Sequence, residues 1–290
     1  MIMYTVKIQN STGDTIQLYP SSDYMLMSMT GITPADATIN ATETASQDGA
    51  TFNSSHVMPR NIVITFDIRG EGAIVRKRRI ELYRYIKTKR PVRVFLANDQ
   101  RSVYTDGYVE RMDDAGTIFS QREQFQLSII CPDPFFRDNE TGERVISFSA
   151  VTGLFNFPFA IGSPIPFSTR ERTYLKTIEN DGDVPCGVTL RLISNGAISN
   201  PWFYNETTGQ RMTFDIDLET GDELVVSTVQ GHKSATLVRA GAETNVINAL
   251  SHDSKWITLE PGDNTFYYNA DDGATNMQLV FVYNILFEGI

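Results

Sequence analysis

The chain has 290 residues, of which 41% are hydrophobic and 21% charged, and its formal net charge is −10 at pH 7. This length fits two domains that each bury a core, and no apolar run reaches the ~18–20 residues that a membrane-spanning helix needs. Residues 1–137 hold 16 Lys or Arg against 15 Asp or Glu, whereas residues 138–290 hold 9 against 20. An acidic second half argues against sequence-specific nucleic acid as a ligand, because phosphates would be repelled.

The first half reads as a series of short strands. Residues 1–18 predict two strands around a turn at 10–14. The stretch 61–68 is the clearest strand, because its isoleucines and one phenylalanine alternate onto one face. Further strands are predicted at 92–96, 103–112 and 121–130.

One helix is predicted, over residues 73–88. Val75, Leu82 and Ile86 superpose on one side of it at 100° per residue. The opposite side is basic, with side chains at Arg76, Lys77, Arg84 and Lys87. Such a face is either a solvated surface or the binding surface for an acidic partner or nucleic acid.

The segment 33–55 is poor in large apolar residues and rich in Thr, Ala, Asn and Gly. Two structures fit this composition, a mobile surface loop and a long hairpin arm. Asp48 and Gly49 supply a hairpin turn signal. A hairpin with so little apolar content cannot be stable alone and would need a partner to order it.

A domain boundary is predicted after the stretch 124–136. Residues 125–129 alternate as a half-buried strand. Pro132 and Pro134 then remove backbone donors and bias their neighbours away from helix. The sequence therefore predicts a first domain over 1–137 and a second over 138–290.

The second half predicts about seven or eight short strands separated by turns such as those at 180–183, 219–222 and 261–264. This spacing is typical of a β-sandwich or jelly roll. The cleanest strand is 212–218, where alternate apolar side chains face inward. The whole chain is therefore expected to be all-β with a single helix.

No catalytic or metal site is predicted. The three histidines lack metal-ligand spacing, the two cysteines are expected to be free thiols, and no nucleotide-binding or nucleophile motif occurs. No cofactor is expected. Asp215 and Asp217 alternate outward, as solubilising carboxylates do. Trp202 and Tyr204 are candidates for an aromatic platform that binds a sugar ring, although such stripes are more often core or interface.

Several segments together resemble the distal tail (Dit) protein family of siphophages. The most specific is ICPDPFF at 130–136. The others occur in the family's order along nearly the whole chain, at 30–32, 48–55, 60–68, 107–110, 178–192, 205–212, 221–228 and 259–266.

The resemblance implies a tail-tube-like β-sandwich or split barrel for the first domain and a galectin-like β-sandwich for the second. It implies a homohexameric ring at the virion tail tip, assembled in the host cytoplasm. This ring joins the tail tube protein to the tail-associated lysin or hub protein and carries receptor-binding or upper baseplate proteins. Within the ring, Asp48, Gly49 and Phe52 are expected at the subunit interface. No enzymatic activity, membrane or secretion signal is expected.

The alternative function is host adhesion, through a carbohydrate-binding second domain.

Overall fold

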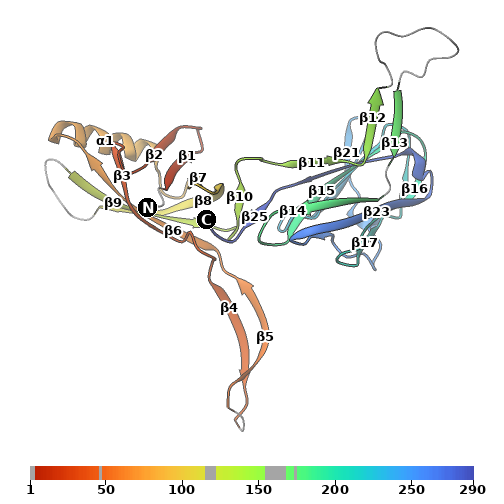
Figure 1. Cartoon of the computed structure of the whole chain (residues 1–290), viewed down its shortest axis with the longest axis horizontal. Helices are drawn as coiled ribbons and strands as arrows, with labels where there is room; N and C mark the ends of the chain where they lie inside the picture. The colour runs from red at the N-terminus through yellow and green to blue at the C-terminus, as the bar shows by residue number, and fades with distance from the viewer. Residues whose placement is uncertain (1–3, 46–47, 115–121, 154–167, 173–174) are drawn as a thin grey trace. The chain divides into compact units, whose positions relative to one another are not determined.

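The computed structural model describes residues 4–45, 48–114, 122–153, 168–172 and 175–290 (Figure 1). The chain forms two compact units. Unit 1 comprises Met1–Gly142 and Leu286–Ile290, and unit 2 comprises Glu143–Ile285. The division follows Gly142 rather than residue 137, because the short strand at 136–138 still pairs inside unit 1. Residues 286–290 return to unit 1 as well.

Unit 1 is built on one antiparallel sheet in the order β2-β1-β7-β8-β9-β6-β3, with β10 and β25 added beside β8. The bounds are β1 (Thr5–Asn10), β2 (Thr15–Leu18), β3 (Tyr24–Thr30), β6 (Arg60–Arg69), β7 (Pro91–Ala97), β8 (Ser102–Asp114), β9 (Arg122–Cys131), β10 (Phe136–Asp138) and β25 (Leu286–Phe287). In the described residues, β2 and β3 each pair with one strand only. The sheet therefore has two open edges.

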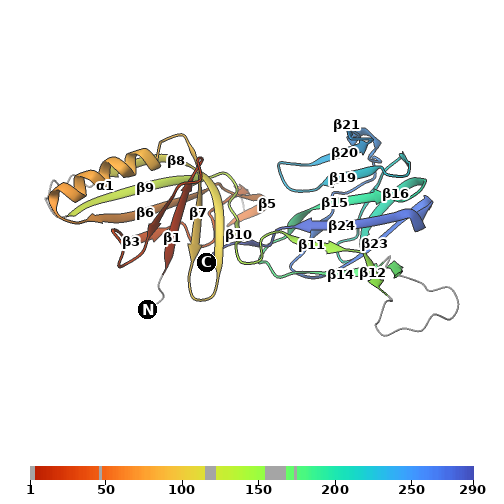
Figure 2. The same ribbon diagram turned by 90° about the horizontal axis from the view of Figure 1, so that it is seen from above.

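The helix α1 (Gly72–Tyr85) lies across one face of this sheet (Figure 2). Val75 and Leu82 are buried beneath it, and Phe66 stacks on Phe125 with ring centroids 5.9 Å apart. The helix ends at Tyr85, before the predicted residue 88, because Ile86 is already extended. No helix in the described part of the chain combines the length and the apolar character needed to cross a membrane.

The segment 33–55 contains a hairpin, which settles the two structures left open by its composition. β4 (Ala37–Glu43) and β5 (Ala50–Val57) form a separate two-stranded antiparallel sheet. We call this hairpin, residues 37–57, the arm. Figure 1 shows the arm leaving the sheet of unit 1 on the side opposite α1.

Unit 2 is a sandwich of two antiparallel sheets. The first contains β11 (Arg144–Ser147), β24 (Met277–Tyr283), β15 (Cys186–Ser194), β19 (Glu223–Ser227), β20 (Ser234–Arg239), β21 (Ala242–Asn245) and β22 (Thr258–Leu259); the second contains β14 (Leu175–Asn180), β23 (Gly262–Asp272), β16 (Ile198–Asn205), β17 (Gln210–Thr213) and β18 (Asp217–Leu218). Buried aromatic rings fill the space between the sheets. The ring of Phe281 contacts both Phe148 and Phe266, with centroid distances of 4.9 and 4.8 Å.

The described part of unit 2 also contains four short elements. β12 (Ser149–Gly153) pairs with β13 (Ser168–Arg172), and η1 (Ile247–Ala249) and η2 (Ala274–Asn276) are single turns of 3-10 helix. The prediction of an all-β chain with one α-helix is confirmed across the described residues.

The predicted strand at 212–218 is wrong in its continuity. It is split into β17 and β18, with Phe214, Asp215 and Ile216 between them. The backbone N–H of Asp215 donates instead to Ala249 O at 2.7 Å, and Phe214 forms an isolated bridge with Leu250. A distant segment therefore interrupts the predicted strand, although the N–H of Phe214 still donates to Pro201 O and the N–H of Asn200 to Ile216 O, both at 3.0 Å.

Candidate assembly surfaces

A buried arginine anchors the root of the arm. Arg60 begins β6 and is 2% exposed. Its guanidinium donates to the carbonyls of Pro134 (2.6 Å), Gly31 (2.7 Å), Thr33 and Glu288 (2.6 Å), and lies 4.2 Å from the ring centroid of Phe136. Burial lowers the pKa of Arg60. One charged side chain thus holds together three segments: the residues before the arm, the turn at Pro132–Pro134 and the residues after β25.

Further contacts hold the same root. The N–H of Ile290 donates to Ile32 O at 3.1 Å, and the N–H of Met58 donates to Asp36 O at 2.8 Å. Gly31 has a φ of +79°, and a Cβ there would lie 2.0 Å from Asn61 O. Only glycine fits such a close backbone approach. The arm therefore leaves from a well-fixed base.

The arm has two chemically different faces. The register places Ala37, Ile39, Ala41 and Glu43 opposite Val57, Ser55, Phe52 and Ala50 on one face. We call this the apolar face of the arm. The other face carries only polar side chains, namely Thr38, Asn40, Thr42, Thr51, Ser54 and His56. Two cross-strand hydrogen bonds belong to it, Asn40 Nδ2 to Ser54 Oγ (3.0 Å) and Asn53 Nδ2 to Thr42 Oγ1 (2.6 Å).

A β-bulge produces this separation. The register shifts between Asn40 and Ala41, which leaves Asn53 as an extra residue on β5. Without the shift, Phe52 would lie opposite Thr42 on the polar face. With it, Phe52 lies opposite Ala41, on the same face as Ile39. Bulges re-aim side chains in this way, and strand alternation alone could not have revealed it.

The three predicted interface residues all lie in the outer half of the arm. Asp48 and Gly49 supplied the predicted turn signal, and they belong to the connection between β4 and β5, which covers positions 44–49. Phe52 is 63% exposed and Ile39 is 67% exposed. The apolar face is thus uncovered within one copy of the chain.

The outer face of α1 is a second uncovered surface. Ile80 and Tyr83 are exposed there, at 54% and 46%. Arg76, Arg84 and Lys87 have no ion-pair partner among the described residues, whereas Arg78 pairs with Asp23 and Arg79 with Glu123. The predicted basic face therefore exists, and it includes exposed apolar side chains.

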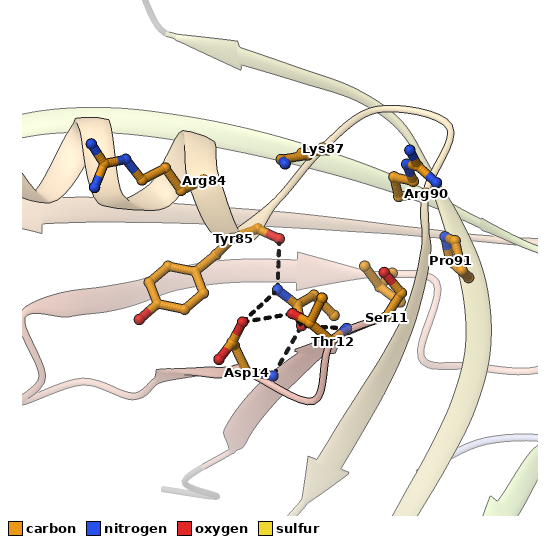
Figure 3. A pocket seen from close by; sticks show the side chains of 10 residues that line it. Ser11, Thr12, Asp14, Arg84, Tyr85, Lys87, Arg90 and Pro91 are labelled. Atoms are coloured by element: carbon orange, nitrogen blue, oxygen red, sulfur yellow. Dashed lines mark hydrogen bonds between the residues drawn. The ribbon is translucent and has the colours of Figure 1, made fainter.

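Beyond the end of α1 lies a hollow of about 330 Å³, which Figure 3 shows from close by. Asn10 organises its wall: its Oδ1 accepts from the N–H and hydroxyl of Thr12 and the N–H of Asp14. Hydrogen bonds from Thr12 and Asn10 lower the pKa of Asp14. Arg84, Lys87 and Arg90 line the rim and extend the positive surface of α1.

The predicted aromatic platform lies on the second sheet of unit 2. Trp202 and Tyr204 alternate on β16 away from the buried Phe203, and Tyr204 lies beside Tyr267 with ring centroids 6.3 Å apart. However, the guanidinium of Arg211 lies 4.3 Å from the centroid of the Trp202 ring. A sugar stacking on that side of the ring would have to displace it.

Neither cysteine offers reactive chemistry. Cys131 and Cys186 are free, as the sequence predicted, and both are buried. Burial raises the pKa of Cys131 to about 11 and that of Cys186 to about 12. The described residues contain no cluster of His, Cys, Asp or Glu suited to a metal ion.

Two family models match the sequence. The phage tail protein RIFT-related domain matches residues 11–144, and the siphovirus-type tail component, C-terminal domain, matches residues 181–283. No curated protein is similar enough in sequence to match.

Solved structures resemble the whole chain. The crystal structure of the SPP1 Dit protein (gp 19.1), described as a paradigm of the hub adsorption apparatus in phages that infect Gram-positive bacteria, aligns with a TM-score of 0.69 at 14% identity, over 97% of this chain and 99% of that one. The phage P2 baseplate in its activated conformation with Ca aligns over 98% of both chains at 10% identity, with a TM-score of 0.44. The SPP1 likeness shows a shared fold.

Proposed function

Because the chain belongs to the siphophage distal tail protein family, we propose that it closes into a homohexameric ring at the tip of the phage tail. As a member of this family it is a structural component of the virion tail. In the proposed ring, unit 1 forms the closed collar. A closed ring has no free edge strand and a fixed rotation between neighbouring subunits.

The observation that carries this proposal is that unit 1 is incomplete as a single copy. Its sheet ends in two open edges, β2 and β3, and the apolar face of its arm is uncovered. Open sheet edges and exposed apolar patches both mark surfaces that associate. Neighbouring copies would pair with the open sheet edges and cover the apolar face of the arm, with Asp48, Gly49 and Phe52 at the contact.

The ring would connect other tail proteins. We propose the tail tube protein on one side, the tail-associated lysin or hub protein on the other, and baseplate or receptor-binding proteins on unit 2, after assembly in the host cytoplasm. The proposed role of the ring is to hold these proteins in a defined arrangement, and it involves no catalysis. The family models describe tail components and name no enzymatic activity.

The proposal is tested by the mass of the purified chain in solution. We expect six times the chain mass of 32.5 kDa, and rings in negative-stain images. Deleting residues 38–54 should reduce the mass to smaller species. A wild-type chain that stays monomeric at high concentration, and that also binds neither tube nor hub protein, would contradict the proposal.

Glycan binding by unit 2 is a second candidate function, favoured by one observation. Trp202, Tyr204 and Tyr267 project from the same sheet face, and aromatic rings on an open face can stack on sugars. Binding of the full chain to a glycan array, abolished by Trp202→Ala and retained by Tyr19→Ala, would support it. An array without signal would rule it out.

A further inference from the structure

We propose that the arm of one copy lies on a second copy of this chain, with its apolar face across the outer face of that copy's α1 and its acidic tip among the cations there. This inference rests on the proposed self-assembly and names the surfaces that make the contact. It involves two surfaces that are separately uncovered in one copy.

The arm needs a cover on one face only. Its polar face is closed by hydrogen bonds between Asn40 and Ser54 and between Asn53 and Thr42. Its apolar face has no such contacts and exposes Ile39 and Phe52. An isolated two-stranded ribbon is marginally stable in water, and burial of an apolar face against another element is what stabilises it. The bulge that brings Phe52 beside Ile39 makes this face continuous.

The arm cannot cover this face with its own α1. Arg60 and the contacts of Ile32 and Asp36 fix the root. From that root the arm leaves the sheet on the side opposite the helix (Figure 1). The helix that the arm meets must therefore belong to another copy.

Charge selects α1 as the receiving surface. The arm contains two charged residues, Glu43 and Asp48, and no Lys or Arg. Around the exposed Ile80 and Tyr83 on the outer face of α1 lie Arg76, Arg84 and, just past the end of the helix, Lys87. Within the described part of the chain these three cations have no ion-pair partner. Several arginines elsewhere in unit 1, such as Arg93 with Asp106 and Arg137 with Asp133, already hold an ion pair. Opposite charges set register and orientation between docking surfaces, while apolar contacts supply most of the affinity.

Disulfide trapping tests the contact directly. Chains carrying Phe52→Cys and chains carrying Ile80→Cys are mixed under mild oxidation. The two native cysteines are buried and should therefore form no cross-links. We expect a cross-linked heterodimer from this pair. Phe52→Cys mixed with Val145→Cys, whose side chain is 65% exposed but lies in β11 of unit 2, should give none.

Charge exchange tests the electrostatic part. Glu43→Lys with Asp48→Lys should raise the concentration for half-assembly ~10-fold or more, a change typical of lost interface contacts. Adding Arg84→Glu with Lys87→Glu should restore assembly. Ser54→Ala, on the polar face of the arm, should leave it unchanged.

The outcomes separate this inference from the ring itself. A wild-type ring with no Phe52–Ile80 cross-link, or with an equal cross-link to position 145, overturns the contact while the ring stands. Failure of the charge exchange to restore assembly overturns it as well. A wild-type chain that does not assemble overturns the ring.

Discussion

At the scale of single residues, the polar groups buried in this protein hold turns and chain crossings in place. Arg60 satisfies four carbonyls from separate segments. In unit 2, Asn205 Nδ2 donates to Thr258 O (2.8 Å) and Asn264 Nδ2 to Glu260 O (2.7 Å). Buried polar groups of this kind are costly to leave unpaired. These residues lie in or beside the segments that resembled the family, so their role there is structural.

Replacing Arg60 should release the root of the arm. Arg60→Met leaves four carbonyls without a donor, so we expect unit 1 to lose ~3 kcal/mol of unfolding free energy. Amide exchange at 31–36 and 288–290 should rise together. Arg69→Met, an exposed site on the same strand, should change stability by less than ~0.5 kcal/mol. Unchanged exchange in Arg60→Met would show that the guanidinium does not hold the root.

The two thiols predict a loss of stability at alkaline pH. Their pKa values, about 11 and about 12, lie above the ordinary thiol value of 9.0. The folded state therefore keeps its protons while the unfolded state loses them. This stability is fully present below pH 9 and declines as pH rises toward 11. Chemical denaturation at pH 8, 9 and 10 measures it, and Cys131→Ala with Cys186→Ala should flatten the pH dependence.

At the scale of elements, the bulge in the arm decides which face is apolar. Inserting one alanine between Asn40 and Ala41 should give Asn53 a partner, restore regular pairing and turn Phe52 onto the same side as Asn40 and Ser54, which is the polar face. We expect the hairpin to persist and assembly to weaken by ~10-fold or more, because the interface loses a large aromatic side chain. Analytical ultracentrifugation measures the assembly. Deleting Gly49 instead shortens the tip without moving Phe52, and it should weaken assembly less.

At the scale of the whole molecule, the chain returns to unit 1 after completing unit 2. β25 pairs with β10, and Glu288 O accepts from Arg60. Removing residues 286–290 should therefore lower the unfolding temperature of unit 1 by several degrees, as expected for a loss of one to a few kcal/mol. The transition of unit 2 should stay in place and serves as the internal control in calorimetry. Equal shifts in both transitions would show that the segment does not belong to unit 1 alone.

Local pattern was enough for much of the fold. Alternation identified β6 and β9, the 3.6-residue period identified α1 and its basic face, and regular turn spacing identified the sandwich of unit 2. These features depend on near neighbours in the chain, which is why they can be read without a structure. Composition and a turn signal also drew attention to the arm, where Asp48, Gly49 and Phe52 are proposed, not shown, to lie at a subunit interface.

The amino-acid sequence by itself determined an all-β chain with one helix, a division into two units and two free thiols, and it reduced the segment 33–55 to a loop or an arm that needs a partner. Only the tertiary structure decided the register of that arm, the split of the predicted strand at 212–218, the place of Arg211 on Trp202 and the return of residues 286–290. Each of these depends on contacts between residues far apart in the chain. Local preferences carry no information about which distant segment supplies the hydrogen bond or covers the face.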